Sequence, residues 1–248
     1  MTNHQSTAII IPARLASKRL PNKPLLQINS KTMIELVWEN AIKSQLGTVL
    51  VATDSQDIVN TIQGRDGLAC MTSENHQSGT DRIYEALNIF DQNHSIEYIV
   101  NLQGDLPTID QFALKEVINL LDKTEVDIGT LVAPFKDFDE MQKDHYVKAE
   151  CNFKSNNHNA RAINFTRIAN KEKMENFYHH IGIYCYELQT LKDFVSFKQS
   201  KNELENKLEQ LRALDNGIDI NVGLASKSPV GVDTNEDFLA IKKIMKYK

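Results

Sequence analysis

The stretch Thr7 to Leu25 reads TAIIIPARLASKRLPNKPL and decides the fold. Its first part, Thr7 to Pro12, is a short β-branched run with few polar interruptions, which is typical of a strand covered on both faces. The part that follows is interrupted by two further prolines and does not suit a regular helix. The sequence therefore predicts a buried central strand that leads directly into an irregular basic loop.

Helical patterns and apolar runs alternate beyond this loop. Apolar residues recur at helical spacing from Met33 to Ile42, and the run Thr48 to Thr53 predicts a second buried strand. Further along, we expect helices near 56–62, 81–90 and 111–121, and strands near 68–71, 97–102 and 127–132. This alternation implies a Rossmann-like, mainly parallel sheet with right-handed crossovers, whose ligands bind at the carboxyl ends of the strands.

The pattern changes at about Phe135. Predicted strands near 147–151, 162–166 and 181–186 are separated by polar stretches, which favours an antiparallel insertion or lid. Helices over 188–195 and 202–215, a strand over 218–224 and a helix from 236 complete the pattern; Leu204, Leu208 and Leu211 mark one apolar face of the helix 202–215. We expect an α/β core over 1–134, the antiparallel insertion over 135–187, and a part over 188–248 that completes the core.

Composition narrows the class of partner. The 248 residues are 41% hydrophobic and 25% charged, with a net charge of -5, which argues against a surface built for nucleic acid or anionic lipid. The three cysteines are widely spaced without a paired C-x-x-C, so neither a disulfide framework nor a zinc site is indicated. No apolar run approaches the roughly 18 residues that span a bilayer. We expect a soluble cytoplasmic protein with a small-molecule partner, no nucleic-acid partner and no membrane partner.

Three cations stand in the basic loop. Arg14, Arg19 and Lys23 follow a buried strand, so they can converge on one polyanion, Arg with a fork of donors and Lys with a point charge. A solvated basic surface is the alternative, but the place after the strand favours binding of a triphosphate. The loop is not a Walker A loop, and the dinucleotide fingerprint G-x-G-x-x-G is missing from the chain.

Two aspartates are candidate metal ligands. Asp105 follows the strand over 97–102, where a carboxylate can hold Mg²⁺ together with phosphate oxygens. Asp233 stands in Gly231-Val232-Asp233-Thr234. Each has an ordinary alternative, since a lone Asp often forms a turn or caps a helix. The metal interpretation of both gains if the two aspartates meet in space.

Two further polar clusters have ordinary alternatives. His76 to Arg82 precedes a helix and suits either base recognition or N-capping by Thr80 or Asp81. His179 and His180 open a strand, where neighbours point to opposite faces, so only one of them can face a site. The neighbouring tyrosines, Tyr178, Tyr184 and Tyr186, are by themselves more typical of packing residues than of ligands.

Together these segments resemble the CMP-Kdo synthetases, the 3-deoxy-manno-octulosonate cytidylyltransferases, over nearly the whole chain. The matching stretches, in order, are IIIPARLASKRLPNKPL, VATD, CMTSENHQSGTDR, IVNLQGDLP, FTR, HHIGIYCY, LEQLRALDNG and GVDTNEDF. The resemblance implies a sheet of the nucleotide-diphospho-sugar transferase type. It also implies coupling of CTP to the sugar acid Kdo, giving CMP-Kdo and pyrophosphate for lipopolysaccharide synthesis, with Mg²⁺ as cofactor. The expected assembly is a homodimer formed through the antiparallel insertion and the C-terminal helices.

The resemblance assigns roles position by position. The triphosphate would be bound by Arg14, Ser17, Arg19 and Lys23, the cytosine by Ser78 and Gly79, and the metal by Asp105 and Asp233. Arg14, Arg19, Lys23 and Asp105 would be the catalytic set. The 2-keto-3-deoxy sugar acid would be contacted by Gln103, Arg167, His180, Tyr184, Glu209 and Gln210, with Arg167 as the partner of its carboxylate.

Several positions depart from the family pattern. Leu106 replaces a usual Glu beside the first metal ligand, and a shorter segment, Ile168 to Glu175, lacks a second expected arginine. The entry to the predicted helix 202–215 reads Ser200-Lys201-Asn202-Glu203 instead of Ser-Pro-Leu-Glu, and Asn206 replaces another Glu. Because most of these changes fall in the sugar-acid half, an 8-amino analogue of Kdo or another sugar acid is an alternative substrate.

Three other functions compete with this one. A different sugar nucleotidyltransferase would share the phosphate loop. A non-catalytic nucleotide-binding relative would bind CTP without turnover, and Leu106 is the residue that favours it. A dehydrogenase on a doubly wound sheet is disfavoured because the glycine fingerprint is absent.

Overall fold

The first strand lies in a group of four parallel strands, as the sequence predicts. Strand β1 (Thr7–Ala13) is buried along its whole length and pairs with β4 (Thr48–Thr53) on one side and β6 (Tyr98–Leu102) on the other. Strand β5 (Leu68–Met71) pairs with β4, so the order is β5-β4-β1-β6. The basic loop therefore leaves the carboxyl end of a strand that has a parallel partner on each side.

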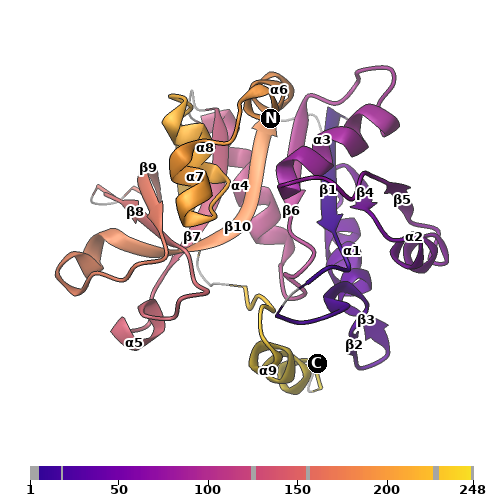
Figure 1. Ribbon diagram of the computed structural model, residues 1–248, viewed down its shortest axis with the longest axis horizontal. Coiled ribbons are helices and arrows are strands. Elements are labelled where there is room, and N and C mark those ends of the chain that lie inside the picture. Colours follow the sequence, from indigo (N-terminus) through magenta and orange to yellow (C-terminus); the bar gives the residue numbers. More distant parts are fainter. Residues whose placement is uncertain (1–5, 18, 124–126, 155–156, 226–228, 247–248) are drawn as a thin grey trace. The chain divides into compact units, whose positions relative to one another are not determined.

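The computed structural model describes residues 6–17, 19–123, 127–154, 157–225 and 229–246 (Figure 1). The chain forms two units, which we call the discontinuous unit (Thr2–Lys115 with Pro229–Lys248) and the continuous unit (Glu116–Ser228). Helix α4 (Gln111–Lys123) runs across the sequence boundary between them. These units do not follow the expected segments 1–134, 135–187 and 188–248, so that three-part division stays a proposal about function.

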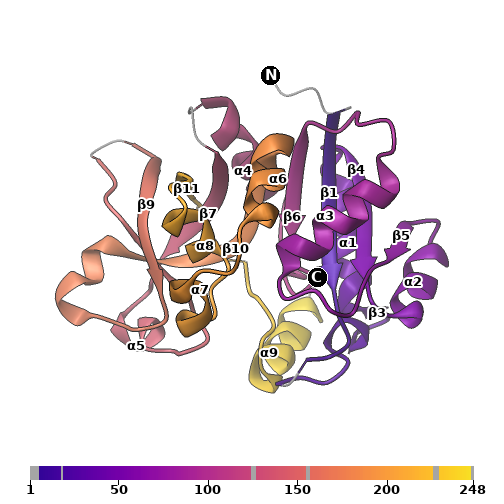
Figure 2. The ribbon, with the colours of Figure 1, turned by 45° about the horizontal axis from the view of Figure 1, so that its top comes forward.

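Helices cover both faces of the four parallel strands. Helices α1 (Met33–Ser44) and α2 (Gln56–Gln63) follow β1 and β4, and α3 (Gly79–Phe90) returns over the opposite face, as right-handed crossovers require (Figure 2). Helix α1 begins at a capping box between Thr32 and Glu35. Its entry is the short hairpin of β2 (Gln27–Ile28) and β3 (Lys31–Thr32), which is too short to give a sequence pattern.

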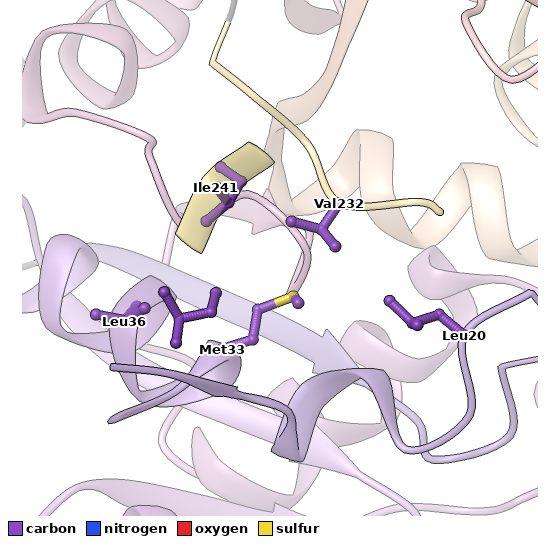
Figure 3. Close-up of a cluster of buried hydrophobic side chains, with 6 residues drawn as sticks. Leu20, Met33, Leu36, Val232 and Ile241 are labelled. Atoms are coloured by element: carbon purple, nitrogen blue, oxygen red, sulfur yellow. The ribbon is translucent and has the colours of Figure 1, made fainter. Parts of the chain in front are cut away.

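A buried apolar cluster attaches residues 229–246 to this unit. Val232 and Ile241, from the end of the unit, pack with Leu20 of the basic loop and with Met33 and Leu36 of α1 (Figure 3). Ile241 belongs to α9 (Asn235–Met245), which starts at a capping box. The cluster therefore fixes the residue after Val232 close to the basic loop.

The continuous unit contains a mixed sheet. Its strands are β7 (Ile128–Pro134), β8 (Lys148–Cys151), β9 (Asn159–Thr166), β10 (Phe177–Glu187) and β11 (Ile220–Leu224), in the order β10-β7-β11-β9-β8, and β8 also pairs with β10. Only β7 and β11 are parallel; the other described pairs are antiparallel. The fold is α/β, but a mainly parallel sheet is not confirmed: the short connection β8–β9 allows only antiparallel pairing, and β10 runs antiparallel to both β7 and β8.

The prediction of a single helix over 202–215 is wrong. The chain instead forms α7 (Lys201–Asn206) and α8 (Gln210–Asp215), separated at Lys207, whose φ of 55° is left-handed. Leu204 is 56% exposed, so it does not share an apolar face with the buried Leu208. The remaining helices are α5 (Phe138–Met141), α6 (Leu188–Ser196) and 3-10 turns at Lys23–Leu25 and Lys171–Asn176. Among the described helices, none is long and apolar enough to cross a membrane.

Candidate active site

Leu20 anchors the basic loop, and the part of the loop before Leu20 exposes its arginine side chains to solvent. Leu20 is buried in the apolar cluster, and its amide donates to Ser17 Oγ at 3.3 Å. Arg14 is exposed, and the Arg19 side chain is 54% exposed. Lys18 lies outside the described residues. The loop thus presents two guanidinium groups to solvent from a fixed backbone, an arrangement suited to binding an anion.

Lys23 joins the two candidate metal ligands. Its Nζ donates to Asp105 Oδ2 at 2.7 Å and to the Val232 carbonyl at 2.9 Å, and lies 3.5 Å from Asp233 Oδ1. Arg19 Nη2 contacts the same Asp233 oxygen at 2.9 Å. Burial acts to lower the pKa of Lys23, but Asp105 and Asp233 outweigh it and raise the pKa above its ordinary 10.5. Two carboxylates and a protonated lysine therefore meet at one place.

Backbone contacts bring the two aspartates together. The amide of Val232 donates to the Asp105 carbonyl at 3.0 Å, and Val230 bonds to the Thr108 hydroxyl at 2.8 Å. Gly104 lies so close to the Pro12 carbonyl that an added Cβ would stand 3.1 Å from it. Residues 230–233 therefore lie along the turn that follows β6.

Leu106 has a packing role in the same turn. It is buried, and its Cδ2 stands 3.5 Å from where a Cβ on Gly231 would lie. The position that carries a Glu in the family pattern thus holds the two backbone segments together by an apolar contact.

The helix-cap alternative fails for both aspartates. The cap of α9 is Thr234 in a capping box with Asp237, and no helix starts directly after Asp105. Within the described ranges, no third Asp, Glu, His or Cys joins the two in a group that would hold a metal ion. A Mg²⁺ bound here would take its other ligands from water or phosphate, as this ion commonly does.

The predicted cytosine residues, Ser78 and Gly79, lie at the start of α3. Ser78 is the N-cap, rather than Thr80 or Asp81: its Oγ accepts from the Asp81 amide at 3.2 Å. Gly79 lies beside Gln103, whose Nε2 would be 3.4 Å from an added Cβ. Gln103 in turn donates to Asn101 Oδ1 at 3.1 Å. The structure therefore brings Gly79 and Gln103 together.

The sequence analysis missed Arg82, which fixes this end of α3. Arg82 is buried, and it donates to Asp54 Oδ2 at 2.9 Å and to Thr72 Oγ1 at 2.6 Å. The pair joins the ends of β4 and β5 to the helix. The sequence signal for this pair was that Asp54 and Arg82 both lie in stretches that resemble the family, VATD and CMTSENHQSGTDR.

In the continuous unit, His180 and Tyr184 lie next to each other on β10, with ring centroids 5.4 Å apart. An irregularity in the pairing with β7 falls between Ile181 and Tyr184, and the Thr130 hydroxyl fills it, donating to the Ile183 carbonyl at 2.6 Å and lying 3.1 Å from His180 Nε2. Burial lowers the pKa of His180 to about 3 and, with Glu209 nearby, raises that of Tyr184 well above 10. Both side chains are neutral at pH 7.

His179 lies on the other face of β10. Its ring is 4.2 Å from that of Tyr146 and 5.6 Å from that of Phe135. Burial, with His145 nearby, lowers its pKa to about 4. His180 is therefore the histidine that shares a face with Tyr184.

The remaining predicted residues lie at loop and helix ends. Arg167 directly follows β9 and donates from Nη1 to the carbonyls of Asp144 and His145, at 3.3 and 3.2 Å. Glu209 is the N-cap of α8 and Gln210 is its first residue. The structure brings His180 and Tyr184 together and places Arg167 on the 143–146 loop.

A buried ion pair supports the start of α8. Arg212 donates to both oxygens of Glu203, at 2.8 and 2.7 Å, and each side chain is less than 5% exposed. Glu203 also closes the capping box of α7 with Ser200. This pair folds α8 back against α7 and explains why the chain turns at Lys207.

The chain is similar to known cytidylyltransferases in sequence and in fold. A family model described as cytidylyltransferase matches residues 8–220. The 3-deoxy-manno-octulosonate cytidylyltransferase of Afipia carboxidovorans is 41% identical over 99% of this chain and 98% of its own, and that of Paramagnetospirillum magneticum is 38% identical over 96% and 97%. A solved structure of CMP:2-keto-3-deoxy-manno-octonic acid synthetase complexed with CTP matches with a TM-score of 0.86, 31% identity, and coverage of 98% of this chain and 99% of that one. The chain belongs to the cytidylyltransferase family, among the 3-deoxy-manno-octulosonate cytidylyltransferases.

Proposed function

We propose that this protein is a Mg²⁺-dependent enzyme that couples CTP to 3-deoxy-manno-octulosonate, giving CMP-Kdo and pyrophosphate for lipopolysaccharide synthesis. One observation of the structure carries the proposal: Lys23 meets Asp105 and Asp233 below a loop that exposes Arg14 and Arg19. The names of the relatives, and the CTP in the similar solved structure, supply the substrates.

The reaction is an in-line displacement at phosphorus. The anomeric hydroxyl oxygen of the sugar acid forms a bond to the α-phosphorus of CTP, and the bond from that phosphorus to the bridging oxygen of the β-phosphate breaks. Pyrophosphate leaves with the electron pair, and the hydroxyl proton goes to solvent. The protein contributes positioning and charge stabilisation, without a covalent intermediate.

The phosphate loop would stabilise the leaving group. Arg14 and Arg19 can each offer several N–H donors to pyrophosphate oxygens, with Ser17 in the same loop. Lys23 stays protonated at neutral pH and offsets the repulsion between Asp105 and Asp233, so the two carboxylates are held close before substrate binds. When bound by these two aspartates, Mg²⁺ would supply Lewis-acid neutralisation of phosphate charge.

The nucleotide base and the sugar acid would use the other residues. Ser78 and Gly79, at the start of α3, would contact cytosine. The sugar acid would meet uncharged donors from His180 and Tyr184, and its carboxylate would pair with the cationic Arg167. Gln103, Glu209 and Gln210 would contact its hydroxyl groups. A homodimer in the cytoplasm completes the proposal; among the described residues, none of the three cysteines forms a disulfide, which suits a reducing compartment.

The test is pyrophosphate release by the purified protein. We expect release with CTP, Mg²⁺ and Kdo together, and background with ATP, GTP or UTP. Parallel assays with the 8-amino analogue compare the two sugar acids by kcat/KM. Binding of CTP without release in either assay would refute the proposal and identify a non-catalytic relative. Analytical ultracentrifugation tests the dimer.

A further inference from the structure

A loop in the continuous unit directs its carbonyl groups at two cations. Lys148, the first residue of β8, donates from Nζ to the carbonyls of Lys143 and Tyr146, each at 3.0 Å. Arg167 donates from Nη1 to the two carbonyls between them, those of Asp144 and His145. Four successive carbonyls of the 143–146 loop thus accept from two side chains.

Lys148 also holds the backbone of Arg167. Its third hydrogen bond, at 2.8 Å, goes to the Arg167 carbonyl. An ammonium group has three N–H donors, so this set uses all of them, and Lys148 cannot bind a substrate directly. The 143–146 loop and the end of β9 are therefore tied together through one atom, the Nζ of Lys148.

The charge on Lys148 is unusual for this position. The residue is 0% exposed, and in the described part of the chain its hydrogen bonds go to carbonyls and not to a carboxylate. A buried charge without an ion-pair partner is costly. Asp144 acts on Lys148 only through longer-range attraction, while Arg167 repels it. Two cations therefore stand side by side at this loop.

We propose that Lys148 is a positioning residue for the carboxylate of the sugar acid. This proposal rests on the proposed function, in which Arg167 binds the carboxylate of the sugar acid. Lys148 fixes the main chain of Arg167, so that its guanidinium group keeps its place while its partners change. The bonds from Arg167 to the loop, at 3.2 and 3.3 Å, are long. A carboxylate, which binds guanidinium at about 2.7–2.9 Å, replaces them. The second positive charge adds attraction for the anionic substrate and not for the cytosine end of CTP.

The test is a double-mutant cycle read out as kcat/KM for the sugar acid. Lys148→Met keeps the length and apolar stem of the side chain and removes its donors and charge. We expect kcat/KM for the sugar acid to fall about 10- to 100-fold, the effect of misplacing a group that orients a substrate. In an Arg167→Lys background the same change should cost less than about twofold, because coupled residues are not additive. The dissociation constant of CTP, measured by calorimetry, should change less than about twofold.

Two controls separate positioning from stability and from general charge. Leu191→Ala removes a fully buried side chain from α6 of the same unit; it should lower Tm and leave kcat/KM for the sugar acid in place. Lys198→Met removes an exposed charge of the same unit and should change neither Tm nor kcat/KM for the sugar acid. If Lys148→Met does not fold, Lys148→Arg enters the same cycle, because a planar guanidinium cannot direct three bonds as an ammonium does.

The outcomes are distinct. Equal losses in the wild-type and Arg167→Lys backgrounds, or a parallel loss of CTP affinity, would overturn the role of Lys148. A wild-type protein without pyrophosphate release would instead overturn the proposed function.

Discussion

Replacing Asp105 by asparagine tests the carboxylate pair most directly. The amide keeps the size of the side chain and one acceptor oxygen, so the contact with Lys23, now 2.7 Å from Asp105 Oδ2, can survive as a hydrogen bond from the ammonium group to an uncharged acceptor. What disappears is one of the two negative charges that Lys23 holds together. The substitution therefore separates charge from packing.

The structure sets the two expected magnitudes. A hydrogen bond to a charged group contributes about 1.5–3 kcal/mol. Because Asp105 is 31% exposed and its loss relieves repulsion with Asp233, we expect a stability cost of only about 1–2 kcal/mol. This corresponds to a fall in Tm of roughly 2–8 °C for a chain of this size. Turnover should fall about 100-fold or more, the scale of one lost electrostatic group, or about 2.7 kcal/mol in the barrier.

The assay is pyrophosphate release at saturating CTP and sugar acid, with Tm measured on the same samples. Asp91→Asn is the matched control: Asp91 is a buried aspartate of the same unit that accepts from the Ser95 and Ile96 amides at 2.9 and 2.8 Å. It should lower Tm and leave turnover within about twofold. Turnover of Asp105→Asn within about threefold of wild type would refute the role of the carboxylate.

Three further predictions concern stability, pH and metal. Glu203→Gln removes the carboxylate charge that pairs with the buried Arg212, so the free energy of unfolding in urea should fall by about 3–5 kcal/mol; a loss under 1 kcal/mol would contradict this role of the ion pair. Because the pKa of His180 is about 3 when folded and 6.5 when unfolded, the unfolded chain binds more protons between these values and stability rises with pH there. Between pH 7.5 and pH 5, the free energy of unfolding of the wild-type protein in urea titrations should therefore fall by about 2 kcal/mol more than that of His180→Gln. Equal decreases in the two proteins would refute this. Removing metal with a chelator should abolish pyrophosphate release and leave Tm nearly unchanged, since Lys23 already holds both aspartates, and Mg²⁺ should restore the rate; full activity in chelator would exclude the metal.

Local patterns were enough to predict most elements. The run Thr7 to Pro12 predicts β1 because a strand buried on both faces needs an unbroken apolar run, and the helical spacing from Met33 to Ile42 predicts α1 for the same reason of burial. The prediction of one helix over 202–215 fails because its end depends on a distant contact. Arg212 pairs with Glu203 across the turn, and nothing in the residues around Lys207 signals that turn.

The candidate site divides in the same way. The place of Arg14, Arg19 and Lys23 after a buried strand is readable from the chain, whereas the meeting of Asp105 with Asp233 depends on the packing of Val232 and Ile241 against the basic loop. Arg82 has no signal of its own, because a buried cation is recognisable only once Asp54 lies beside it.

The discontinuous unit has a consequence for how the protein is made. All of the continuous unit, residues 116–228, leaves the ribosome after Asp105 and before Asp233. The Lys23 ammonium group therefore has only one of its two carboxylates while the nascent chain grows, and Leu20 and Met33 lack the partners Val232 and Ile241 that cover them. Only when residues 229–246 emerge can the carboxylate pair form, so completion of the candidate site is timed to the end of that stretch of translation.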